Sequence, residues 1–162
     1  MLRLFGIILF SGTAAVYGIY LSMRISTGAR QRKALISLMY AIKSGIQFGS
    51  SILSDVYGSF SDDTLEKAGF MKILRSGKPQ ALKDALGCKG LMLSKDVLCN
   101  LTEFSKKLGH SGFAENEELM CSRYIAMLEE EDRKLCVQEK VREDLCRRLG
   151  LLSGLFAALI LI

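Results

Sequence analysis

The single histidine of this chain, His110, is the residue whose type most readily suggests acid–base chemistry. It lies in the stretch Gly109-His110-Ser111-Gly112, and glycines spaced in this way mark a loop. A catalytic base needs a partner group within reach, and no serine or cysteine motif of that kind accompanies His110. We therefore interpret His110 as a surface loop residue. The alternative, a general base, would be excluded if His110→Ala left function intact.

Four consecutive acidic residues, Glu129, Glu130, Glu131 and Asp132, suggest a metal site at first sight. They fall inside a long stretch of helical periodicity, where consecutive side chains point in different directions around the helix. The four carboxylates therefore cannot converge on one ion, and we predict no metal site. Two interpretations stay open: a solvated helix face, or a docking patch for a basic partner.

Five cysteines are too widely and irregularly spaced for a zinc site, because no two of them form a CxxC pair. Four of the five fall where helical periodicity favours a small apolar residue, which predicts buried free thiols in a reducing compartment. The sequence also has no phosphate-binding loop, no HExxH motif and no nucleophile elbow. We predict no catalytic residue and no cofactor, and expect that the protein is not an enzyme. The cysteines are Cys88, Cys99, Cys121, Cys136 and Cys146.

Hydrophobic periodicity predicts helices along the middle of the chain, and no alternating strand pattern persists. Ser94 is expected to cap one of these helices, and Gly109 is expected to end it. The last helix of the middle section is the longest and should be more exposed in its second half, where the apolar stripe thins beyond Val137. The fold class is therefore all-α. The helices are expected at about 31–46, from Ser50 or Ser51 through Tyr57, from Asp62 to Leu74, from Pro79 to Leu86, from Ser94 to Leu108, and at about 114–148.

The N-terminal part of the chain predicts a transmembrane helix, because Leu4 to Met23 are twenty residues without a charge. A cleaved signal peptide is the alternative, but the apolar run continues to Arg24, past the small residues that could form a cleavage site. Basic residues follow this segment, at Arg24, Arg30, Arg32 and Lys33. We interpret them as contacts with lipid headgroups and as the topology signal that places the next domain in the cytoplasm. No aromatic residues interleave with them, so no nucleic-acid partner is predicted.

The C-terminal residues 149–162 form a second apolar segment, too short to cross a bilayer comfortably but unsuited to water. Gly150 and Gly154 have the spacing of closely packed membrane helices, and Ala14 and Gly18 repeat that spacing in the first helix. This suggests that the tail packs against the N-terminal helix; a glycine joint between soluble helix and lipid is the alternative. The expected organisation is an anchor over 1–23, a cytoplasmic helical bundle over 24–148 and a membrane segment over 149–162.

Three stretches of the C-terminal third resemble the stage III sporulation protein AB family, and the layout agrees along essentially the whole chain. They are Leu101-Thr102-Glu103-Phe104, Leu108-Gly109-His110-Ser111 and Arg147-Arg148-Leu149-Gly150-Leu151-Leu152-Ser153-Gly154-Leu155. The chain departs from the family pattern at Ser51-Ile52-Leu53-Ser54, which lacks two usual prolines, at Gly112 in place of aspartate, and at Asn116 in place of glutamine. These departures concern the loop caps rather than the fold.

The resemblance implies a six-helix-type bundle like the cytoplasmic domains of type II secretion and type IV pilus platform proteins. It also implies a role in the channel complex between mother cell and forespore, with a secretion-type ATPase, stage III sporulation protein AA, and other stage III sporulation membrane proteins as partners. The expected location is the cell membrane of a spore-forming bacterium, on the mother-cell side. A membrane-tethered adaptor or scaffold unrelated to sporulation is the alternative. The candidate partner-binding residues are Glu129, Glu130, Glu131, Asp132, Arg147 and Arg148.

Overall fold

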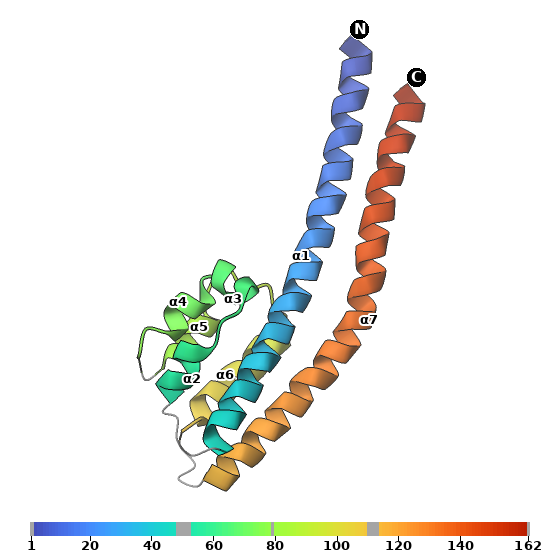
Figure 1. Ribbon diagram of the computed structural model, residues 1–162. Coiled ribbons are helices and arrows are strands. Elements are labelled where there is room, and N and C mark those ends of the chain that lie inside the picture. The colour runs from blue at the N-terminus through green and yellow to red at the C-terminus, as the bar shows by residue number, and fades with distance from the viewer. Residues whose placement is uncertain (1, 48–52, 79, 110–113, 162) are drawn as a thin grey trace. The chain divides into compact units, whose positions relative to one another are not determined.

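The structure is a computed structural model that describes the chain except for residues 1, 48–52, 79, 110–113 and 162 (Figure 1). Within helices, the surroundings of residues 2–11, 14, 15, 114, 147, 150, 151 and 153–161 are also outside the description. The described residues form seven helices and no strand, which confirms the all-α prediction for that part of the chain. The helices are α1 (Leu2–Gln47), α2 (Leu53–Ser59), α3 (Asp63–Lys67), α4 (Phe70–Leu74), α5 (Ala81–Leu86), α6 (Lys95–Lys107) and α7 (Ala114–Leu161).

The chain divides into two units, and the longest helices, α1 and α7, each contribute to both. Unit 1 combines Met1–Thr27 with Leu135–Ile162, and unit 2 is Gly28–Lys134. The long helix predicted to start near residue 114 therefore contributes its first turns to unit 2 and its later turns to unit 1.

Unit 2 has a continuous apolar core contributed by most of its helices. The apolar face of α1 supplies Leu35, Leu38 and Ile42, at the helical spacing expected from the sequence. In the segment of short helices, α3 packs against α4, α4 against α5, and α5 against α6. Further buried core residues are Leu65, Phe70, Met71, Leu74, Val97, Leu101, Phe104, Cys121, Ile125 and Leu128.

Local signals account for several helix boundaries in unit 2. Ser94 caps α6 by accepting a hydrogen bond from the Val97 backbone N–H at 3.3 Å, as predicted. Gly109 has a φ of 81°, the left-handed conformation that was predicted to end this helix. The single helix expected from Asp62 to Leu74 is instead two, because Gly69 adopts a φ of 79° between α3 and α4.

Unit 1 consists of two helical segments that run side by side in opposite directions (Figure 1). The Ser22 hydroxyl is buried and donates a hydrogen bond to Glu143 Oε1 at 3.2 Å. Gly18, one turn before Ser22, is also buried. The environments of Ala14, Gly150 and Gly154 lie outside the described part, so the predicted packing of the four small residues stays a prediction.

Among the residues that the structure describes, no helix combines the length and the apolar character that a membrane crossing requires.

Candidate functional site

The acidic residues at 131 and 132 lie against the interior of unit 2. Asp132 Oδ1 accepts a hydrogen bond from Arg32 Nε at 2.9 Å, and the two side chains are only 15% and 5% exposed. Asn100 donates to Glu131 Oε1 at 3.0 Å. Arg32 was interpreted as a headgroup contact; its burial beside Asp132 corrects that interpretation, because a buried guanidinium needs a charged partner.

The other two acidic residues of the quartet make different contacts. The Tyr40 hydroxyl donates to Glu129 Oε1 at 2.8 Å, and this hydrogen bond raises the pKa of Tyr40. Glu130 pairs with Arg133 at 2.6 Å and with Lys134 at 3.3 Å, both within α7. Exposed pairs of this kind add little stability. Each of the four acidic side chains thus has its own partner, as expected when consecutive residues point around a helix.

The other residues that the sequence singled out, Arg147, Arg148 and His110, have no described contact with this acidic cluster. Arg148 is exposed in unit 1, whereas the side chain of Arg147 lies outside the described part. His110 also lies outside the described residues.

Burial of the cysteines is less uniform than predicted. Cys121 is fully buried, but Cys99 is exposed, and Cys88, Cys136 and Cys146 are half-buried. The prediction concerned four of the five cysteines, and the exposed one, Cys99, lies on α6 outside the buried face that Val97 and Leu101 define.

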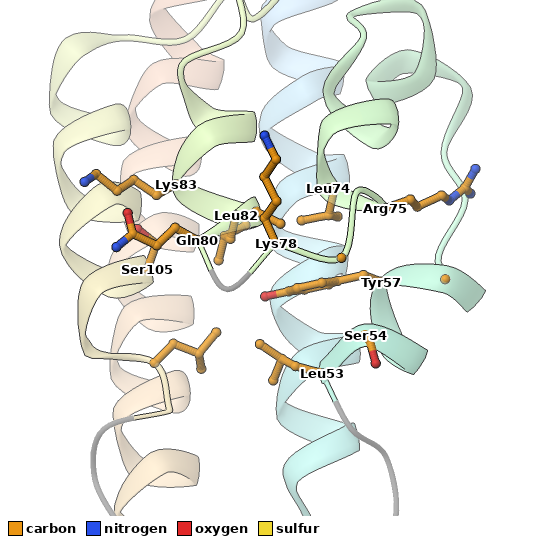
Figure 2. Close-up of a pocket in the computed structure, with 14 residues that line it drawn as sticks. Leu53, Ser54, Tyr57, Leu74, Arg75, Lys78, Gln80, Leu82, Lys83 and Ser105 are labelled. Atoms are coloured by element: carbon orange, nitrogen blue, oxygen red, sulfur yellow. The ribbon is translucent and has the colours of Figure 1, made fainter.

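A cavity of about 330 Å³ in unit 2 is the feature that sequence reasoning missed (Figure 2). It lies between α2, the end of α4 with the turn that follows, the start of α5 and the end of α6. Its volume falls in the range of sites that hold small molecules. The described lining residues are Leu53, Ser54, Tyr57, Gly58, Leu74, Arg75, Gly77, Lys78, Gln80, Ala81, Leu82, Lys83, Ser105 and Leu108.

Tyr57 contributes a buried polar group to this cavity. Tyr57 is 7% exposed. Figure 2 shows the hydroxyl pointing into the space between Leu53 and Gln80. Burial raises the pKa of Tyr57, so the phenol stays protonated and able to donate a hydrogen bond.

Charge at the cavity is entirely basic among the described lining residues, with Arg75, Lys78 and Lys83 and no acidic residue. Arg75 is partly satisfied within the protein: it donates to the Phe60 carbonyl at 2.8 Å and pairs with Glu66 at 3.4 Å. Lys78 and Lys83 are exposed and have no described ion pair. The cavity therefore combines apolar walls with exposed basic residues around it.

The sequence contained no local signal for this cavity. Its lining comes from four helices separated along the chain, and no short motif joins Tyr57 to Lys78 and Lys83. Only the topology of unit 2 brings them together.

Comparison with known proteins gives one match. A model of the family described as stage III sporulation protein AB matches residues 3–162. The chain matches no curated protein and no solved structure.

Proposed function

The chain belongs to the stage III sporulation protein AB family, which gives it a sporulation-related role, and from this premise we propose that it is a membrane platform for a partner ATPase. The observation that carries the proposal is the extent of the match, which covers residues 3–162 rather than one short motif. In this proposal the protein is non-catalytic and part of the channel complex between mother cell and forespore. The ATPase, of the secretion type, supplies the nucleotide chemistry.

The proposed membrane attachment rests on the sequence. Leu4 to Met23 contain no charge, and the apolar tail 149–162 follows Arg148. The contact of Ser22 with Glu143 supports a pairing of the segments that lead into these two apolar stretches. The basic residues after the first stretch support a cytoplasmic location for unit 2 on the mother-cell side.

The surface proposed to meet the ATPase is centred on Glu130, Arg133 and Lys134 of α7. Their side chains are 43%, 78% and 68% exposed, so a partner could compete for their charges. Asp132 and Glu131 are less suitable, because both hold contacts inside unit 2. The predicted acidic patch is thereby narrowed to Glu130, whose described ion pairs are with exposed residues of its own helix.

A charge-reversal experiment tests the platform role. The full chain carrying Glu130→Lys is reconstituted in phospholipid vesicles, and co-sedimentation of the partner ATPase is measured beside sporulation efficiency in cells. We expect recruitment to fall roughly tenfold, as for the loss of a contact worth about 1.4 kcal/mol. Glu115→Lys is the matched control, since Glu115 is also exposed on α7 and undergoes the same change of charge.

Two results would count against the proposal. Equal recruitment by the Glu130→Lys and Glu115→Lys chains would remove Glu130 from the contact surface. Absence of any recruitment by the unaltered chain would favour the second candidate, an adaptor that works without an ATPase.

A further inference from the structure

An apolar stripe runs along α7 within unit 1, on the side of the helix that is turned away from α1. Its residues recur every three or four positions, which places them on one face of the helix. The opposite face meets α1, since Glu143 accepts the hydrogen bond from Ser22. Glu139 and Cys146 lie one turn from Glu143 on that inner face, and both are half-buried. The stripe consists of Val137, Val141, Leu145, Leu149 and Leu152, which are between 49% and 66% exposed.

Lipid suits only the last part of this stripe. Leu149 and Leu152 belong to the apolar tail, but Val137 and Val141 precede it in a stretch interrupted by charged residues. Charged side chains are costly to place in hydrocarbon, and Val137 lies roughly 16 Å along the helix from Arg148. A long exposed apolar stripe outside the lipid marks a surface that contacts protein.

The charges beside the stripe indicate which protein surface fits it. At 3.6 residues per turn, Asp144 lies on one flank of the stripe and Arg142 on the other. Both are exposed, and neither has an ion pair among the described residues. When two copies of a helix pair in parallel, one flank of the first copy faces the other flank of the second. Asp144 then lies opposite the partner's Arg142, at levels that differ by about 3 Å along the axis. A second copy of this chain therefore supplies both an apolar stripe and the opposite charges.

The tail determines the direction in which two copies would run. Residues 149–162 follow the charged part of α7 directly, so two copies whose tails enter the same membrane are parallel. Confinement to one membrane also raises the effective concentration of the copies. This orientation rests on the membrane attachment proposed above, whereas the stripe and its flanking charges do not.

We propose that the protein forms a parallel dimer through residues 137–152 of α7. Val137, Val141 and Leu145 pack against the same residues of the second copy. Two symmetric ion pairs, each between Asp144 and the partner's Arg142, fix the register of the helices. The contact of Ser22 with Glu143 is kept in the dimer, because it lies on the other side of the helix.

Single-cysteine chains test the dimer. The full chain, with every other cysteine replaced, is produced in bacterial membranes and treated with a short bis-maleimide. The natural Cys136 and Cys146, each retained alone, are matched controls for Val137→Cys and Leu145→Cys, since each control is the sequence neighbour of a stripe position. The stripe positions should give roughly fivefold more cross-linked dimer, because only they face their own copies across the two-fold axis.

A charge exchange tests the register. In the Val141→Cys chain, Asp144→Arg should lower the yield of dimer roughly fivefold, because two attractive pairs become repulsive. Addition of Arg142→Asp should restore the yield, since opposite charges then face each other again. A yield that ignores both exchanges would overturn the proposed register.

Three readouts separate the possible failures. Equal yields from the stripe positions and their neighbours would overturn the dimer and leave lipid or another protein as the cover of the stripe. In a chain with cysteines at both 137 and 145, products that join 137 to 145 in place of 137 to 137 would overturn the parallel orientation. Extraction of the same membranes with alkaline carbonate measures the proposed attachment by itself, since a dimer released from the membrane would still cross-link at the stripe.

Discussion

Cys121 and Cys99 show how strongly position changes the properties of one residue type. Cys121 is fully buried, and burial raises its pKa to about 11, with the Glu117 carboxylate adding to the shift. Cys99 is exposed on α6. Because the thiolate is the reactive form, the two thiols should differ in reactivity as well as in access.

We expect iodoacetamide at pH 8 to modify Cys99 at least ten times faster than Cys121 in the folded chain. Peptide mass spectrometry over time measures both sites in one sample, and the same reaction in urea serves as the control, where the two rates should converge. Similar rates in the folded chain would contradict the burial of Cys121.

The raised pKa of Cys121 also determines the direction in which the stability of the folded state changes with pH. The folded state should lose stability as pH rises from about 9 to about 11, because the thiol of the unfolded chain ionises first.

The elements of unit 2 are held together by a close approach between the turn after α5 and the α3–α4 segment. A Cβ atom on Gly90 would lie 2.3 Å from the Ala68 carbonyl oxygen. The Cys88 thiol contacts the same oxygen at 2.8 Å. The Gln31 amide of α1 donates to the Gly90 carbonyl at 3.0 Å and accepts from the Met92 N–H at 2.6 Å. The turn is thus fixed from two sides.

Gly90→Ala should therefore lower the free energy of unfolding by about 3 kcal/mol, because backbone rather than a flexible side chain blocks the added methyl group. Gly58→Ala is the matched control: Gly58 lies within α2, and a Cβ there would meet nothing within 4 Å. That change should stabilise the protein by about 0.5–1 kcal/mol through helix propensity. Urea unfolding followed by circular dichroism measures both. Effects of the same sign and size would show that the close approach is not rigid.

The elements also show what sequence could and could not predict. Ser94 and Gly109 lie next to the helix whose ends they determine, so a local pattern identified both. Gly69 stands inside an apolar periodicity that continues past it, and nothing local distinguished a broken helix from a tolerated glycine. Arg32 was misinterpreted for a related reason, since its partner Asp132 lies 100 residues away. The cavity at Tyr57 depends on topology alone and could not be predicted.

At the scale of the whole molecule, unit 1 joins the two ends of the chain through α1 and α7. Ser22 and Glu143 mark the contact, whereas Met23 and Val141 are 65% and 56% exposed. Each of these two helices thus has one face in contact with the other helix and one face exposed.

Cross-linking should distinguish these faces. In a chain without its natural cysteines, the pair Ser22→Cys and Glu143→Cys should be joined efficiently by a short bis-maleimide, as measured by mass spectrometry of the linked peptides. The control pair, Met23→Cys with Val141→Cys, should give at least fivefold less product. No product at 22 and 143, or equal product from both pairs, would contradict the pairing of the helices. The same experiment on Ala14→Cys with Gly154→Cys tests the predicted packing of the apolar segments.

The buried pair of Arg32 and Asp132 has a consequence for the order in which the protein is made. The ribosome synthesises Arg32 100 residues before its counter-ion. At about 5–20 residues per second, the guanidinium waits roughly 5–20 seconds for that carboxylate. Until then this buried contact of the guanidinium cannot form, and a charge that lacks part of its compensation is costly to bury. Synthesis of the early part of α7 therefore sets the earliest moment at which unit 2 can close, and the nascent chain before that moment is the form that chaperones and proteases encounter.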